Sequence, residues 1–166
     1  MDITIGRYDI FDYFCLKKIM FQRLLENRVN DKLGDGKAIV VIGARQVGKT
    51  TLIKDLLKEK EYLFLDADDP TIRQLLHNPN TEQIKTFLGD YETVFIDEAQ
   101  RIEGIGLTLK IITDQFTNVQ LIVSGSSSFD LGNKLNEPLT GRKWEYELFP
   151  IAWEEFEKKV GFIKSE

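Results

Sequence analysis

One stretch of the chain constrains its fold: Ala38-Ile39-Val40-Val41-Ile42-Gly43-Ala44-Arg45-Gln46-Val47-Gly48-Lys49-Thr50-Thr51-Leu52. Its apolar beginning is typical of a buried strand, and the segment that starts at Lys49 has the apolar spacing of a helix. The residues between them match G-x-x-x-x-G-K-[ST], the sequence pattern of a phosphate-binding loop. The stretch therefore predicts a strand, a tight loop and a helix that together hold a nucleotide phosphate.

The chemistry of such a loop needs these residue types. Gly43 and Gly48 let the backbone curl so that successive N–H groups point at one anion, and the following helix adds its positive N-terminal end. We expect the Lys49 ammonium between the β- and γ-phosphates and the Thr50 hydroxyl on Mg²⁺. The predicted nucleotide contacts are Gly43, Ala44, Arg45, Gln46, Val47, Gly48, Lys49, Thr50 and Thr51. The alternative is a tight strand-to-helix turn with an exposed lysine.

A second apolar strand, residues 93–96, ends in two acids, Asp97 and Glu98. It follows the phosphate loop after one intervening strand, which is the position of a Walker B strand. We expect Asp97 to hold Mg²⁺ through water, and Glu98 to orient and deprotonate an attacking water. The alternative is an acidic strand end that caps the following turn.

A third apolar strand, residues 119–123, runs into the small hydroxyl residues 124–128. Its end should lie between the ends of the other two strands, where a hydroxyl can sense the γ-phosphate or position water. Ser124 and Ser126 are the candidates, and their spacing does not decide between them. Ordinary polar turn residues are the alternative.

Near the end of the chain, Trp144, Tyr146 and Leu148 alternate with charged residues, which predicts a half-buried edge strand. Arg142, just before it, is a candidate to touch phosphate in its own subunit or in a neighbouring one. A solvated or salt-bridged arginine is the alternative.

Between these segments the pattern alternates strands with helices. Residues 62–66 read as a short strand, Asp69 as the cap of a helix whose first residue is Pro70, and residues 81–88 as a second helix. Further helices are predicted around residues 107–116 and 151–160. This alternation predicts an α/β fold with a mostly parallel sheet.

Composition narrows the function classes. The chain has 166 residues, of which 42% are hydrophobic, and a net charge of -5. That length allows a sizeable core, and the charge does not support a broadly basic nucleic-acid surface, although a local patch is not excluded. No stretch has the length and apolarity of a membrane span, and no signal-peptide order opens the chain. With Cys15 as the single cysteine, we expect a cytoplasmic protein.

Four motifs together resemble one family. They are G-A-R-Q-V-G-K-T-T-L, V-F-I-D-E-A-Q-R-I, L-I-V-S-G-S-S-S-F-D-L and L-T-G-R-K-W-E-Y-E-L-F-P-I-A-W-E-E-F. In this order they are similar to the prokaryotic AAA+-like ATPases, phosphate-loop NTPases of the additional-strand, catalytic-glutamate branch that are related to archaeal-type and STAND ATPases. The resemblance covers about residues 37–156.

The resemblance implies a three-layer sandwich with a five-stranded sheet, and ATP or ADP bound with Mg²⁺ at residues 43–51. It implies metal and water roles for Asp97 and Glu98, a serine sensor within residues 124–128, and a place for Arg142 in the family's Gly-Arg motif. It also implies an ATPase core over residues 37–166, without the family's usual C-terminal region. The helical extension over residues 1–36 is predicted instead from apolar residues that recur at roughly helical spacing between Tyr8 and Leu25.

Two functions fit these motifs. The first is Mg²⁺-dependent ATP hydrolysis, in which Lys49 helps to neutralise developing charge, Glu98 handles the water and an arginine assists. The second is a slow-hydrolysing, nucleotide-dependent switch that controls a partner protein or a further domain. The motifs are also compatible with a homo-oligomer. A kinase is disfavoured because a glutamate poised on water suits hydrolysis.

Overall fold

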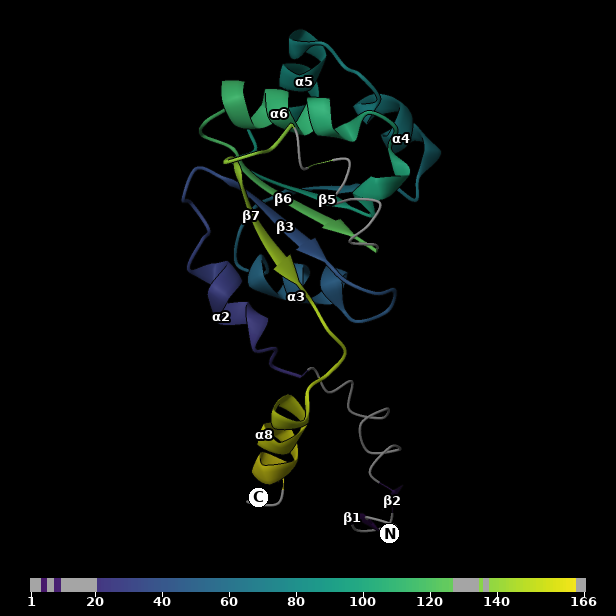
Figure 1. Ribbon diagram of the computed structural model, residues 1–166, viewed down its shortest axis with the longest axis vertical. Coiled ribbons are helices and arrows are strands. Elements are labelled where there is room, and N and C mark those ends of the chain that lie inside the picture. The colour runs from purple at the N-terminus through teal and green to yellow at the C-terminus, as the bar shows by residue number, and fades with distance from the viewer. Residues whose placement is uncertain (1–3, 6–7, 10–20, 127–134, 136–137, 164–166) are drawn as a thin grey trace. The chain divides into compact units, whose positions relative to one another are not determined.

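Five parallel strands form one sheet in the order β4-β5-β6-β3-β7 (Figure 1). Their bounds are β3 Ala38–Ile42, β4 Leu63–Asp66, β5 Thr93–Asp97, β6 Gln120–Gly125 and β7 Lys143–Glu147. The order confirms the predicted α/β fold and makes β7 an outermost strand of the sheet. Because every neighbouring pair is parallel, the carboxyl ends of all five strands meet at one edge of the sheet.

Helices cover both faces of this sheet, which confirms the three-layer sandwich. Figure 1 shows α2 and α3 on one face and α4, α5 and α6 on the other. The helices are α2 Leu25–Asn30, α3 Lys49–Leu56, α4 Pro70–Leu76, α5 Thr81–Leu88 and α6 Ile105–Gln115, with a short 3-10 helix, η1, at Ala99–Arg101. All but η1 overlap helices that the sequence patterns predict.

The two faces have separate cores. In β3, Ile39 and Val41 are buried in the core that includes residues of α3. The alternate residues Val40 and Ile42 are buried in the core that includes residues of α4, α5 and α6. A strand buried on both faces must be apolar at every position, which explains the continuous apolar run before the phosphate loop.

The computed structural model describes residues 4–5, 8–9, 21–126, 135 and 138–163. By its contacts the chain divides into two units, one of Leu24–Pro150 and one of Met1–Arg23 with Ile151–Glu166. The boundary that the sequence predicts, between an extension over residues 1–36 and a core over residues 37–166, does not coincide with this division. It stays a prediction. No helix within the described residues has the length and apolarity that crossing a membrane requires.

The second unit contains two short antiparallel strands, β1 Thr4–Ile5 and β2 Tyr8–Asp9, and the helix α8 Trp153–Ile163. The Nε atom of Arg23 lies 3.1 Å from a carboxylate oxygen of Glu155. Residues 10–20, which carry most of the predicted N-terminal helical pattern, lie outside the described part of the chain.

Candidate functional site

The phosphate loop begins where β3 meets the continuation of β7. The Leu148 N–H donates to the Ile42 carbonyl at 2.7 Å, and a Cβ built on Gly43 would lie 2.3 Å from the Leu148 carbonyl oxygen. That separation is far below any van der Waals contact, so only glycine fits there. At the other end of the loop, Gly48 has φ +94° and ψ +23°, the left-handed conformation that glycine adopts without strain. Both glycines are therefore required by the local geometry.

The other loop residues take different positions. Ala44, Arg45 and Gln46 are exposed, and Gln46 has a left-handed φ of +63°. Val47 packs against the core that includes α3 residues, and Thr51 is exposed in the first turn of α3. The loop thus places a run of backbone at the surface, immediately before the N-terminus of a helix.

The Lys49 side chain is 4% exposed and folds over the loop. Its Nζ atom lies 2.9 Å from the Ala44 carbonyl oxygen and 3.1 Å from that of Gly43. Burial lowers the pKa of the Lys49 ammonium from its ordinary value; the Glu98 carboxylate opposes this shift most, followed by Asp97. A smaller lowering of the pKa comes from the Arg45 guanidinium. Lys49 is therefore within electrostatic range of both acids at the end of β5.

Asp97 joins three stretches of the sequence. Its Oδ2 atom accepts a hydrogen bond from the Thr50 hydroxyl at 2.6 Å. Its Oδ1 atom accepts from the buried Ser124 hydroxyl and, at 3.1 Å, from the Glu98 N–H. The phosphate-loop helix, the β5 end and the β6 end, each selected from the sequence, thus converge on one buried carboxylate.

Glu98 follows at the strand end in a left-handed conformation, with φ +52° and ψ +36°. Its Oε2 atom accepts a hydrogen bond from the Gln100 Nε2 atom at 2.5 Å, and the same nitrogen lies 2.7 Å from the Ser126 hydroxyl. The sequence patterns do not single out Gln100, although it lies in the V-F-I-D-E-A-Q-R-I motif. Residues 127 and 128, the other serines of the run, lie outside the described residues.

The structure does not bring the Arg142 guanidinium to this cluster, and its contact with phosphate, in its own subunit or in a neighbouring one, stays a prediction. The Arg142 carbonyl accepts from the Ala38 N–H at 2.9 Å, which places it at the amino-terminal edge of the sheet. The phosphate loop lies at the opposite edge of the sheet, where the carboxyl ends of the strands meet. The Arg142 guanidinium lies 2.5 Å from Asp114 of α6, so the observed state is the salt-bridged alternative.

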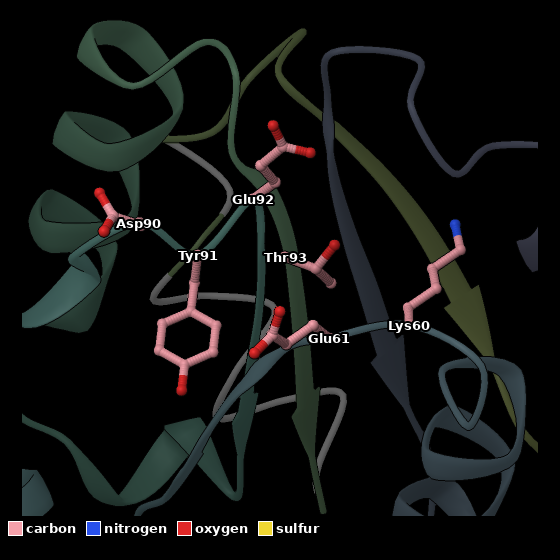
Figure 2. A pocket seen from close by; sticks show the side chains of 6 residues that line it. All are labelled: Lys60, Glu61, Asp90, Tyr91, Glu92 and Thr93. Atoms are coloured by element: carbon pink, nitrogen blue, oxygen red, sulfur yellow. The ribbon is translucent and has the colours of Figure 1, made fainter.

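A hollow with a cavity of about 700 Å³ lies at the amino-terminal edge of the sheet. Its lining residues are Lys60, Glu61, Asp90, Tyr91, Glu92 and Thr93. Figure 2 shows its three carboxylates around Tyr91 and Thr93, with the Lys60 amino group pointing away from them. Three anionic groups against one cation do not suit an anionic nucleotide, so this hollow does not compete with the phosphate loop as the nucleotide site.

Three curated proteins are similar in sequence to part of this chain. An uncharacterised protein of Methanocaldococcus jannaschii is 23% identical over 145 residues, which cover 84% of this chain and 32% of the relative. Uncharacterised proteins of Mycobacterium bovis and Mycobacterium tuberculosis are 30% identical over 116 residues, which cover 69% of this chain and 25% of each relative. The chain therefore spans only about a quarter to a third of the curated relatives it matches.

Two solved structures share the fold. The Walker-type ATPase of Pyrococcus abyssi superposes with a TM-score of 0.62 at 20% identity, covering 90% of this chain and 60% of that one. The Pif1 helicase of Candida albicans superposes with a TM-score of 0.54 at 14% identity, covering 89% of this chain and 44% of that one. Identities this low show the architecture alone.

A family model described as an AAA domain matches residues 35–157, which include the phosphate loop and the ends of β5 and β6. The match covers most of the chain and agrees with the resemblance of its four motifs. The chain belongs to the AAA domain family and has the phosphate-loop NTPase fold.

Proposed function

We propose that this chain binds ATP with Mg²⁺ and hydrolyses it to ADP and phosphate. The observation that carries the proposal is the 2.6 Å contact between the Thr50 hydroxyl and the Asp97 carboxylate, beside Glu98. Two hard oxygen donors at the end of a phosphate loop suit Mg²⁺, which takes few protein ligands and keeps water and phosphate oxygens. The donor set therefore fits the metal that the family implies.

In this proposal the backbone N–H groups of residues 43–51 hold the phosphates, and Lys49 supplies a positive charge to them. The contacts of Lys49 with the Gly43 and Ala44 carbonyls keep its ammonium over the loop. Bound Mg²⁺ would contribute neutralisation of charge on the β- and γ-phosphate oxygens. Thr50 and Asp97 are the residues that would hold it, Asp97 through water.

Glu98 is the proposed general base. Its carboxylate opposes the lowering of the Lys49 pKa, which supports a position within electrostatic range of the phosphate-loop lysine. A carboxylate there can accept the proton of an attacking water. Water as the acceptor makes the reaction a hydrolysis and not a phosphoryl transfer to another substrate.

Of the two serine candidates, we assign the sensor role to Ser126. The Ser124 hydroxyl is fully buried and donates to Asp97, so it supports the metal ligand. Ser126 lies one residue beyond β6, is half-buried, and contacts Gln100. Its hydroxyl is therefore the one at the surface of the site.

A slow-hydrolysing nucleotide switch is the second candidate, and the position of Arg142 favours it. An arginine that stabilises transferring phosphate is worth about a thousandfold or more in rate. Arg142 is held by Asp114 at the far edge of the sheet, so it would act only on the nucleotide of a neighbouring copy.

A homo-oligomer or a partner protein, and the cytoplasmic location, stay predictions.

The test is Glu98→Gln, which removes the base and keeps the side-chain size. We expect turnover to fall about a hundredfold or more, the typical contribution of a general base, while the Kd for ATP stays close to that of the wild type. Glu92→Gln makes the same chemical change at the opposite edge of the sheet and should leave turnover unchanged.

The wild-type turnover number separates the two candidates. Turnover near the usual enzyme range of about 1 per second or more supports the ATPase, and turnover orders of magnitude slower with tight binding supports the switch. Wild-type turnover retained by Glu98→Gln would contradict the base assignment.

A further inference from the structure

The Gln100 side chain links the base Glu98 to the segment that follows β6. Its Nε2 atom lies 2.5 Å from Glu98 Oε2 and 2.7 Å from Ser126 Oγ. Its Oε1 atom accepts from the Ser126 N–H at 3.2 Å. One amide group thus spans two elements that are separated by 26 residues in sequence.

The partners fix which way this amide faces. A backbone N–H can only donate, so the Gln100 oxygen must face Ser126 N–H. The amide nitrogen then faces Glu98, and its two hydrogens suffice for the Glu98 carboxylate and the Ser126 hydroxyl. A hydrogen bond donated to a carboxylate is charge-assisted and stronger than a neutral one. This bond therefore restricts the orientation of the Glu98 carboxylate.

The backbone beneath Gln100 is anchored. Gln100 is the middle residue of η1, between the fully buried Ala99 and the exposed Arg101, and Ile102 just beyond is also fully buried. The Arg101 N–H donates to the Glu98 carbonyl at 3.0 Å, and the Ile102 N–H donates to the Ala99 carbonyl at 3.0 Å. The Gln100 side chain therefore projects from a fixed turn, which is what a residue needs in order to hold another side chain in place.

We propose that Gln100 is a positioning residue that holds the Glu98 carboxylate at the phosphate loop and couples it to Ser126. The proposal rests on the proposed hydrolysis and deepens it. Glu98 is half-buried, and without the Gln100 donor its flexible side chain would sample several rotamers. Misplacement of a catalytic group by about 1 Å can cost about a hundredfold in rate, so the predicted effect falls on kcat.

Two substitutions separate the contacts of Gln100. Gln100→Ala removes all of them. Gln100→Glu has nearly the same shape and keeps an acceptor for the Ser126 N–H, but it cannot donate to Glu98. We expect both variants to lower kcat about ten- to a hundredfold with KM and the ATP Kd within about threefold of the wild type. A role confined to holding the Ser126 segment would instead leave Gln100→Glu close to wild type, and that result overturns the proposal.

Gln120 offers a matched control at the other edge of the sheet. Its Oε1 atom accepts from the Gly34 N–H at 2.6 Å, and its Nε2 atom donates to the Lys37 carbonyl at 3.0 Å. Gln120→Ala removes a comparable bridge, so we expect a lower Tm with an unchanged kcat. A fall in kcat equal to that of Gln100→Ala would show a general loss of structure and overturn the proposal.

A double-mutant cycle tests whether Gln100 acts through Glu98. In the Glu98→Gln background, Gln100→Ala should lower the residual turnover by less than about twofold, because no base remains to be positioned. A full ten- to hundredfold loss in that background would contradict the proposal. If the wild-type chain turns over no ATP, the proposed function fails and this inference fails with it. If the wild type is active and both Gln100 variants match it, this inference alone fails.

Discussion

At the residue scale, the site is organised by the hydrogen bonds that Asp97 accepts. The carboxylate is 5% exposed and has hydrogen-bond donors from Thr50, Ser124 and the Glu98 backbone. A buried carboxylate without such donors would be strongly destabilising, so this arrangement fixes three elements around one group. The motifs single out Thr50 and Asp97 by residue type and position, whereas the hydroxyl run at the end of β6 leaves Ser124 and Ser126 as equal candidates and does not predict the bond from Ser124 to Asp97.

The positions of two residues could not be predicted from the sequence. Gln100 lies in a quoted motif, but only the folded turn at η1 directs its amide to both Glu98 and Ser126. Arg142 could not be placed from its position in the chain, because the sequence does not say which edge of the sheet the start of β7 occupies. Parallel pairing with β3 puts it at the edge opposite the loop.

Gly43 gives the first prediction at this scale. A methyl group at this position would meet the Leu148 carbonyl oxygen at 2.3 Å, so either β7 or the loop must move. We expect Gly43→Ala to lower the free energy of unfolding by about 1–3 kcal/mol, as overpacking does, and to weaken ATP binding. Denaturant unfolding measures the first effect, with Gly161→Ala as the control because a Cβ there contacts nothing. Equal stability of the two variants would contradict the close packing of the loop on Leu148.

At the scale of elements, helix starts are set by short polar signals. Asp69 accepts from the Thr71 N–H at 2.7 Å, with Pro70 at the first helical position, as the sequence predicts for α4. Residues 81–88 are predicted as a helix and observed as α5, but the Asn80–Gln83 capping box at its start is a feature that only the structure shows. Propensity locates a helix, whereas the reciprocal bonds of a cap depend on side-chain rotamers.

The capping box yields a prediction for α5. The Asn80 side chain accepts from the Gln83 N–H at 2.9 Å, and the Gln83 side chain accepts from the Asn80 N–H at 2.8 Å. Asn80→Ala should cost about 1 kcal/mol of unfolding free energy, the usual loss of such a cap. Asn80→Asp keeps the acceptor and adds a charge that suits a helix N-terminus, so it should stay within about 0.5 kcal/mol of the wild type. Equal losses in both variants would contradict the cap.

At the scale of the molecule, alternating strands and helices predict a parallel sheet, and the resemblance of the four motifs predicts its five strands. The division of the chain into two units was not predictable. It depends on contacts such as that of Arg23 with Glu155, which lie 132 residues apart. Local patterns carry no information on pairing across such a distance, whereas the phosphate loop and its strand are contiguous in sequence.

The central claim is that the unit of residues 24–150 contains a working nucleotide site, and thermal unfolding with and without Mg-ATP tests it most directly. The variants are Lys49→Ala and, as a control, Lys58→Ala, which removes an exposed lysine beyond the end of α3. At a ligand concentration of about a hundred times Kd, the account predicts stabilisation of about 2.7 kcal/mol in the wild type and in Lys58→Ala, seen as a rise in Tm. Lys49→Ala should show no such rise. No rise in the wild type, or an equal rise in Lys49→Ala, would contradict the assignment of the phosphate loop as the nucleotide site.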